Sequence, residues 1–436
     1  MTRSHPHSSP SPTTPSGHGL PGLRGRGFAL LVAATAIGLC GFAAVLPLVP
    51  LWATRGGAGE FGAGVTTAAF MLTTVLTQLR MPWLLDHAGG YRWAFPIGCL
   101  VMGLPTPLFS ATTDLGPLVA VSAVRGVGFG MVTVAGTALA ARLVPAEQMG
   151  RATGYYGLAV GVPQVLILPG GVGLALHLGF DTAFWLTGLC SVAGAVLSAG
   201  VWFADGGRNR PALRGAGRAR RPGPAGARVP MSALAAPLVL MLLTASAASA
   251  LVTFVAIPLE GVAWLASGAL ALYALGAVVG RWSAGSLHDR LRRSLLLLPG
   301  MAVALAGTVL TAAGLWWHGG TGHLGTGAAF LVLCGAAVFG LGFGAVQNET
   351  VTLMLNRAGP AGFGRASAVW NIGYDGGAGA GAMGLGLVIQ SLGYGPAFAL
   401  TAAALAAALP LARAGEPPAS PPGGCDPGRG EAEDRG

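Results

Sequence analysis

The sequence predicts an all-α integral membrane protein with twelve transmembrane helices in two pseudo-symmetric six-helix bundles. Three observations lead to this prediction. The composition is 53% hydrophobic and 9% charged, with a mean hydropathy of +0.65, whereas soluble proteins carry about a quarter charged residues. Twelve apolar segments approach the ~20 residues that a helix needs to cross a bilayer. The third observation is an internal repeat.

This repeat relates the two halves of the chain. GVGFG at Gly126 to Gly130 returns as GLGFG at Gly340 to Gly344, 214 residues later, and Gly-Arg-Ala follows each copy at the same distance. A third matched pair contains Asp86 and Asp289, which lie 203 residues apart. The difference of 11 residues fits a longer loop in the second half. A repeat of this length in an apolar chain indicates two homologous membrane bundles.

The elements expected along the chain follow from these apolar segments. Residues 1–26 and 414–436 are rich in Pro, Gly and Ser, which predicts disordered cytoplasmic tails. Residues 204–231 hold seven arginines and form the predicted cytoplasmic linker between bundles 27–203 and 232–413. The expected spans are 27–53, 62–85, 94–111, 117–141, 152–176, 182–203, 232–258, 262–285, 294–317, 326–355, 366–390 and 395–413.

The placement of arginine predicts the orientation. Every basic residue is an arginine, and of the 25, three lie inside helices (Arg80, Arg125 and Arg281) and one, Arg55, lies on an outer loop. The other 21 then fall on cytoplasmic segments, which is the positive-inside pattern of a protein with both termini in the cytoplasm. We expect a multi-pass protein of the cell membrane, embedded in the lipid bilayer and monomeric.

Several other functions are disfavoured by the sequence. The basic balance reflects membrane topology rather than nucleic-acid binding. The five cysteines are scattered without ligand spacing, and His318 and His323 have no Cys or carboxylate partner nearby in the sequence, so we expect neither a metal nor a cofactor. Gly379 to Gly384 matches G-x-G-x-x-G only inside an apolar helix, which disfavours dinucleotide binding. No paired catalytic groups appear within the spans, so an enzyme is not expected.

Two loop motifs and one helix signature resemble those of the major facilitator superfamily. The loop Gly285-Ser-Leu-His-Asp289-Arg290-Leu-Arg292-Arg293 is similar to the family's loop between the second and third helices of a bundle, and the first-half copy keeps Asp86, Gly89 and Arg92. Arg125 with Gly126, Gly128 and Gly130 resembles the family's signature in the fourth helix. The resemblance covers roughly residues 27 to 413. It implies the family's twelve-helix fold and a transporter that exposes a central site alternately to each side.

The resemblance and the residues together assign roles to particular side chains. An arginine or carboxylate inside a transmembrane helix is costly unless it serves a site, so Arg125, Asp375 and Glu349 are the candidates for proton coupling or substrate binding. Desolvation favours the neutral form of a buried acid, which suits a group that takes up and releases protons. The alternative is a structural ion pair or a neutral, hydrogen-bonded acid. Candidate cavity-lining residues are Gln347, Asn348, Asn371, Tyr374, Tyr155, Tyr156 and Gln164.

The remaining candidates concern movement between conformations. A carboxylate at the cytoplasmic end of a helix can bind a helix N-terminus or an arginine and so latch one conformation. The latch candidates are Asp86, Arg92, Gly285, Asp289, Arg290 and Arg293. The candidates for close helix packing or bending are Gly126, Gly128, Gly130, Gly161, Pro163, Gly377 and Gly381.

The function expected from this resemblance is secondary active transport of a small molecule, coupled to protons. In general character the chain resembles bacterial exporters of drugs or secondary metabolites, which favours proton antiport. Proton symport that imports a small organic anion or a sugar is the alternative, since Arg125 could bind a carboxylate. A membrane sensor or scaffold that transports nothing is the alternative from another class, with the basic linker as its contact surface.

Overall fold

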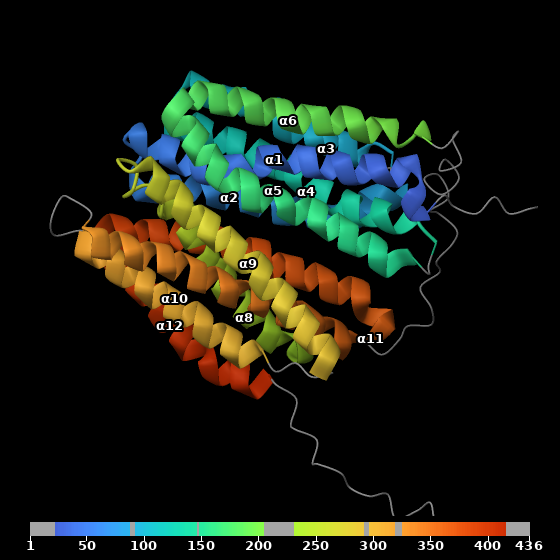
Figure 1. The fold of residues 1–436 in the computed structure, drawn as a ribbon. Coiled ribbons are helices and arrows are strands. Elements are labelled where there is room, and N and C mark those ends of the chain that lie inside the picture. The colour runs from blue at the N-terminus through green and yellow to red at the C-terminus, as the bar shows by residue number, and fades with distance from the viewer. Residues whose placement is uncertain are drawn as a thin grey trace, which may run out of the picture. The chain divides into compact units, whose positions relative to one another are not determined.

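The structure is a computed structural model that describes residues 22–87, 92–145, 148–204, 231–291, 296–318 and 325–415. The predicted tails and linker lie largely outside these ranges. The described residues are almost entirely helical (Figure 1). The helices are α1 (Arg26–Arg55), α2 (Gly59–His87), α3 (Ala94–Gly103), α4 (Leu115–Arg142), α5 (Met149–Leu178), α6 (Phe180–Gly200), α8 (Met231–Phe254), α9 (Ala263–Leu291), α10 (Leu297–His318), α11 (Thr326–Leu392) and α12 (Tyr394–Gly415), with short 3-10 helices η1 (Gly22–Arg24) and η2 (Thr106–Ala111).

These helices form two compact units. The first comprises Met1–Pro224 with Val252–Ala271 and Ala382–Leu387, and the second comprises Ala225–Leu251, Leu272–Gly381 and Val388–Gly436. In the first unit α1 packs against α2, α5 and α6, while α4 packs against α2 and α3. Arg55 forms an ion pair with Glu260 within this unit. Both residues belong to predicted outer loops, so these two loops lie at the same end of the unit.

The third predicted span is interrupted in the structure. Helix α3 ends at Gly103, and the chain continues as η2 rather than as an α-helix. Pro105 and Pro107 flank the first residue of η2, and neither has an N–H to donate to the preceding turn. The sequence therefore contains the cause of the break. The peptide carbonyl of Met102 lies just before this break and accepts a hydrogen bond from the Arg125 side chain.

Helix α11 contains the tenth and eleventh predicted spans. Its 67 residues would reach ~100 Å in a straight helix, but the Trp370 Nε1 donates to Thr350 Oγ1 at 3.0 Å. The ring centroids of Phe343 and Tyr374 are only 6.2 Å apart. Residues 20 and 31 positions apart can meet in this way only if the chain reverses between them. We call Thr326–Thr350 the first arm of α11 and Trp370–Leu392 the second arm.

Matching glycines hold the central helices together in both units. A Cβ atom at Gly126 or Gly130 would collide with the Phe70 or Thr74 carbonyl of α2. In the second unit, Gly340 and Gly344 meet the Tyr273 and Ala277 carbonyls of α9 in the same manner (the offsets are again 214 and 203 residues). The sequence repeat is therefore a repeat of helix contacts.

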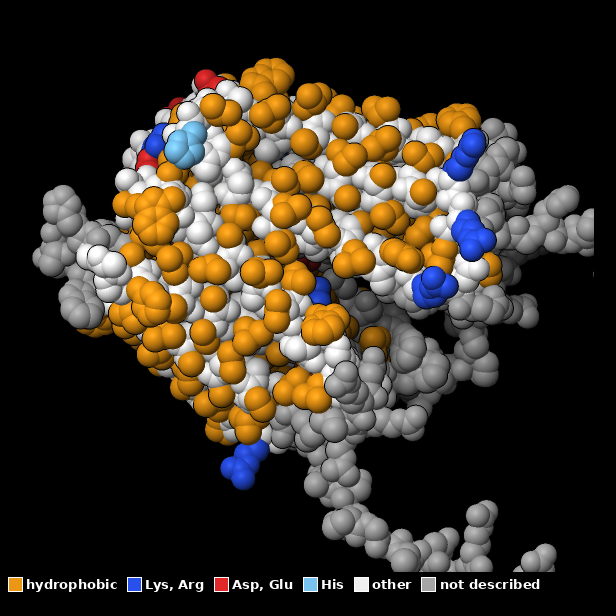
Figure 2. Space-filling model, in the orientation of Figure 1, with side chains coloured by type: hydrophobic (Ala, Val, Ile, Leu, Met, Phe, Trp, Pro, Cys, Tyr) orange, Lys and Arg blue, Asp and Glu red, His pale blue; other side chains and the backbone are white. Residues whose placement is uncertain are grey.

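Eleven helices of the described residues are long and apolar enough to cross a membrane. They correspond to eleven of the twelve predicted spans. The predicted span 366–390 is helical as part of α11 but is not among the eleven, because it is rich in glycine and carries Asp375. Figure 2 shows hydrophobic side chains spread over the visible helices, with most of the visible charged side chains near helix ends. The chain is a multi-pass integral membrane protein of the predicted all-α class.

Candidate functional site

Arg125 is the buried cation of the first unit, with only 3% of its surface exposed. Its Nε donates to the Met102 carbonyl and to Thr106 Oγ1, both at 3.0 Å, and its Nη2 donates to the Gly41 carbonyl at 3.1 Å. These acceptors belong to α1 and to the break between α3 and η2. Arg125 thus joins three elements through neutral oxygen atoms, and among the described residues it has no carboxylate partner.

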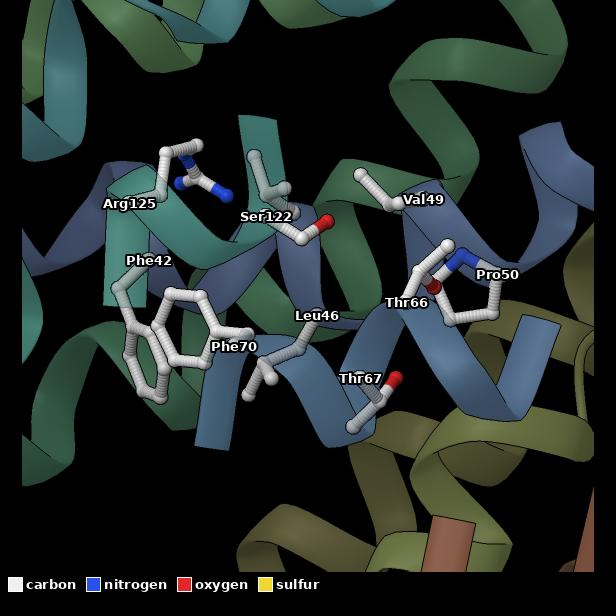
Figure 3. A pocket seen from close by; sticks show the side chains of 10 residues that line it. Phe42, Leu46, Val49, Pro50, Thr66, Thr67, Phe70, Ser122 and Arg125 are labelled. Carbon is white, nitrogen blue, oxygen red and sulfur yellow. The ribbon is translucent and has the colours of Figure 1, made fainter. Parts of the chain in front are cut away.

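A small pocket opens beside this guanidinium. It is lined by Arg125 and Ser122 from α4, and by residues of α1 and α2. Figure 3 shows how these side chains surround the space: Phe42, Leu46, Val49, Pro50, Thr66, Thr67 and Phe70. The volume of about 20 Å³ accommodates a water molecule or one substituent of a larger ligand, since a water needs roughly 10–15 Å³ on this measure.

Aromatic rings form the apolar side of this site. Phe42 stacks on Phe129 with ring centroids 4.0 Å apart, and Phe70 lies 5.7 Å from Phe42. The guanidinium carbon of Arg125 is 5.6 Å from the Phe109 ring centroid and 5.9 Å from that of Phe70. Aromatic faces attract a cation, which helps to stabilise this charge inside the bundle. The combination of one cation and several rings suits an amphipathic ligand.

The two candidate acids lie in the second unit, one on each arm of α11. Glu349 is 1% exposed and Asp375 is 5% exposed. The contacts of Phe343 with Tyr374 and of Thr350 with Trp370 fix the register of the two arms. In this register Asp375 lies level with about residue 343, roughly six residues or ~9 Å along the axis from Glu349. Arg125 lies in the other unit.

The predicted cavity-lining residues divide into two groups. In the second unit Gln347 is buried, while Asn348 and Asn371 are half-buried. In the first unit Tyr155 is exposed and Gln164 half-buried. Tyr156, by contrast, is buried and packed against Gly136. Its surroundings are those of a packing residue.

The latch candidates are only partly described. The side chains of Asp86, Asp289 and Arg290, and all of Arg293, lie outside the described residues. Gly285 has Asn348 as its nearest neighbour, and a Cβ atom added at this glycine would lie 3.8 Å from the Asn348 amide oxygen. The guanidinium of Arg92 lies over the rings of Trp93 and Trp202, 4.3 and 4.4 Å from their centroids. The role of these residues as a latch stays a prediction.

The glycine candidates occupy different environments. Gly128 packs on α3, and Gly377 and Gly381 pack on Leu242 and Ser246 of α8. Gly161, however, has open space where a side chain would extend, and Pro163 lies inside α5. These glycines of α4 and α11 are therefore closely packed. A bending role for Gly161 and Pro163 stays a prediction.

Arg281 is a polar residue of the second unit that the sequence analysis did not assign to a site. It lies on α9, and its side chain is exposed. The internal repeat shows that Arg281 departs from its counterpart in the first unit. Subtracting the 203-residue offset leads to Gln78, whose amide donates to Thr133 Oγ1 at 3.3 Å. The second unit has replaced a neutral amide by a cation.

The groups seen here are of kinds that can bind a ligand; their role as a site stays a prediction. Among the described residues, no cluster of three His, Cys, Asp or Glu side chains could hold a metal ion. Cations, buried acids and aromatic rings can bind and orient a ligand and exchange protons with it. All of them lie on helices expected to span the bilayer.

Comparisons with known proteins bear on this site. The family model described as "Major Facilitator Superfamily" matches residues 30–382. A "Chloramphenicol resistance protein" of Streptomyces lividans is 30% identical over 305 residues, which are 65% of this chain and 70% of the relative.

Solved structures show the same fold at low sequence identity. The nucleoside transporter NupG has a TM-score of 0.68 at 10% identity and covers 89% of this chain and 98% of its own. The peptide transporter POT in complex with sulfate has a TM-score of 0.68 at 12% identity, with coverage of 90% and 95%. A bacterial homolog of the human lysosomal transporter Spinster, inward-facing and occupied, has a TM-score of 0.64 at 14% identity, with coverage of 89% and 95%.

Proposed function

The chain belongs to the Major Facilitator Superfamily, and on this premise we propose that it is an exporter that moves drug-like small molecules across the membrane in exchange for protons. Its family and structural relatives are transporters rather than enzymes. The function rests on alternating access to a central site. We further propose that the protein resides in the plasma membrane with both termini in the cytoplasm.

The single observation that carries the export proposal is the similarity to the chloramphenicol resistance protein. Resistance to a drug is the outcome expected of an exporter. The pocket beside Arg125 is compatible with such a cargo, because it combines a hydrogen-bond donor with the rings of Phe42 and Phe70. An amphipathic molecule with a polar substituent would place that substituent toward Arg125.

Asp375 and Glu349 are the proposed proton-coupling groups. Both are buried on helix arms inside the second unit, where a carboxylate is stable as the neutral acid or beside a cation. In an antiport cycle the acid loses its proton when substrate binds from the cytoplasm and regains one when the site faces outward. Substrate binding would thus favour the deprotonated acid, and protonation of the acid would weaken substrate binding.

The alternative function, symport of a small organic anion, is favoured by one observation. Arg125 is buried against neutral oxygens, and no carboxylate of the described residues pairs with it. An anionic substrate would supply the missing negative charge. Symport predicts proton uptake on substrate binding, whereas antiport predicts proton release.

A proton-release measurement tests these proposals. Chloramphenicol is added to purified protein in detergent and weak buffer at pH 7, and the pH change is followed for wild type, Asp375→Asn and Glu349→Gln. The exposed acid Asp181 at the start of α6 provides the control variant Asp181→Asn. We expect proton release in wild type and control, and its loss in at least one of the other two.

The other outcomes are equally decisive. Proton uptake on binding would replace antiport by symport. Binding without any proton change would remove the coupling roles of both acids. Absence of chloramphenicol binding, together with no accumulation of labelled chloramphenicol in everted vesicles under an acid-inside gradient, would overturn the export proposal for this class of drug.

A further inference from the structure

Two buried hydroxyl groups of the first unit are left unused by the fold. Thr67 on α2 is 6% exposed and Ser122 on α4 is 3% exposed, yet neither hydroxyl group forms a hydrogen bond with any described residue. A buried hydroxyl group without a partner is costly. The other buried serines and threonines in the described parts of α1 to α6 and η2 all donate to backbone carbonyls: Thr35, Thr66, Thr74, Thr106, Thr187, Ser191 and Ser198.

Both unused hydroxyl groups belong to residues that line the pocket beside Arg125. Ser122 precedes Arg125 by three residues and so lies on the same face of α4, and Thr67 precedes Phe70 by three residues on α2. The two helices are in close contact at this level, since a Cβ atom at Gly126 would collide with the Phe70 carbonyl. Figure 3 shows Ser122, Thr67 and Arg125 around one space. The unused hydroxyl groups therefore border the same space as the buried cation.

Neighbouring threonines of α2 show how such hydroxyl groups are used where they serve packing. Thr73 Oγ1 donates to the Ala123 carbonyl at 2.8 Å, and Thr74 Oγ1 donates to the Gly126 carbonyl at 3.0 Å. Both threonines thus join α2 to α4. Thr67 lies on the same helix but makes no such bond, so its hydroxyl group is available to a ligand.

Arg125 adds an unused hydrogen-bond donor to this pocket. Its Nε and Nη2 donate to oxygen atoms of the fold, but its Nη1 forms no hydrogen bond with a described residue. A guanidinium only donates, whereas a serine or threonine hydroxyl group both donates and accepts. A ligand group that accepts from Arg125 and donates to Ser122 or Thr67 would use both kinds of partner. A hydroxyl group can do both.

The size of the pocket restricts the ligand group further. Its volume of about 20 Å³ is little more than the roughly 10–15 Å³ that one water molecule needs. Among the substituents of organic molecules, a hydroxyl group most closely matches water in size and in hydrogen bonding. A primary hydroxyl group, at the end of a carbon chain, enters such a space more easily than one on a branched carbon. The rings of Phe42 and Phe70 supply an apolar wall for the rest of the molecule.

We propose that Thr67, Ser122 and Arg125 form a subsite for a primary hydroxyl group of a neutral amphipathic substrate, whose aromatic part lies against Phe42 and Phe70. This subsite rests on the export function proposed above and specifies the class of substrate. Thr67 and Ser122 would distinguish a hydroxyl group from a substituent of similar size that cannot donate. Such a substituent displaces water without replacing its hydrogen bonds, which loses affinity.

The test compares two ligands that differ only in this group. Thiamphenicol has a primary hydroxyl group where florfenicol has fluorine, which cannot donate a hydrogen bond. Isothermal titration calorimetry measures the binding of each to wild type, Thr67→Val, Ser122→Ala and the double variant. The controls Thr35→Val and Ser198→Ala remove buried hydroxyl groups that donate within their own helices and belong to residues outside the pocket lining.

Wild type and both controls should bind thiamphenicol roughly fivefold more tightly than florfenicol, as expected from about one hydrogen bond. Thr67→Val and Ser122→Ala should each reduce this ratio, and the double variant should bring it to about one. Affinity for florfenicol should change little. Thermal melting and gel filtration should show folded variants as stable as wild type, because the deleted hydroxyl groups form no hydrogen bond with the described residues.

Three outcomes would overturn the subsite: no binding of thiamphenicol, equal affinity of wild type for both ligands, and an unchanged ratio in the folded double variant. A lowered melting temperature with an unchanged ratio would assign the hydroxyl groups to packing instead. Export is judged separately by chloramphenicol accumulation in everted vesicles. A hydroxyl preference that depends on Thr67 and Ser122, without accumulation, would establish the subsite and reject export. Accumulation with equal affinities for the two ligands would do the reverse.

Discussion

At the scale of single residues, the two units differ most where they carry charge. Arg125 on α4 corresponds, at the 214-residue offset, to Phe339 on α11, which is buried and stacked 5.8 Å from Phe343. Arg281 on α9 corresponds to Gln78 on α2. Each unit thus has a cation where the other has a neutral side chain. Residues that depart from an otherwise preserved repeat are the ones expected to serve function rather than packing.

The hydrogen bonds of Arg125 predict that this position needs the planar guanidinium group and not only a positive charge. Arg125→Lys keeps the charge, but one ammonium group cannot reach acceptors on both α1 and the α3–η2 break. We expect at least a tenfold loss of chloramphenicol-driven proton release and a loss of roughly 1.5–3 kcal/mol of stability for each hydrogen bond removed. Transport assays and thermal melting measure the two effects.

The control for this prediction is Arg80→Lys on the exposed part of α2, which should leave both quantities unchanged. A fully active Arg125→Lys protein with a wild-type melting temperature would show that charge alone suffices at this position.

At the scale of helices, glycine determines how closely α9 and α11 approach. Gly276, Gly280, Gly340 and Gly344 bring the two backbones into contact, as Gly126 and Gly130 do for α4 and α2. Small residues allow such contacts inside a membrane, where packing and hydrogen bonds rather than the hydrophobic effect join helices. The polar groups of α9 and α11 are therefore held at a fixed register.

Two substitutions on the same helix test this packing. A Cβ atom at Gly340 would collide with the Tyr273 carbonyl, whereas Gly384 has open space around it. We expect Gly340→Ala to destabilise the protein by about 1–3 kcal/mol. Gly384→Ala should be neutral or stabilise it by up to ~1 kcal/mol, because alanine favours helix. Thermal melting in detergent compares them, and equal effects would contradict the assigned contact.

At the scale of the whole molecule, the distribution of arginine predicts which ends of the helices face the cytoplasm. The pairing of Arg55 with Glu260 places two predicted outer loops at one end of the first unit. This agrees with the alternation of twelve spans, because both loops follow an odd-numbered span. The prediction of cytoplasmic termini depends on the same alternation.

Reporter fusions test this topology. Alkaline phosphatase folds to its active form only outside the cytoplasm, and green fluorescent protein is expected to fluoresce only inside. We expect a fluorescent and phosphatase-inactive protein for fusions after Gly415 and within residues 205–230. A fusion after Gly261 should show the opposite pattern. Phosphatase activity at residue 415 would invert the orientation or change the number of spans.

The sequence by itself determined the class of fold, the repeat and most helix positions. Long apolar segments leave few alternatives in a bilayer, where each backbone group must be bonded within its own helix. The predicted ranges 27–53 and 117–141, for example, became Arg26–Arg55 and Leu115–Arg142. Arg125, Glu349 and Asp375 were also identifiable from sequence, because charge inside an apolar helix is rare.

The tertiary structure alone decided how these residues are surrounded. The acceptors of Arg125 are two peptide carbonyls and a threonine hydroxyl that lie 84, 23 and 19 residues away in sequence, and backbone acceptors leave no trace in the amino-acid pattern. The approach of Phe343 to Tyr374 likewise depends on the reversal of α11. Long-range packing, unlike membrane insertion, is set by shape complementarity between distant segments.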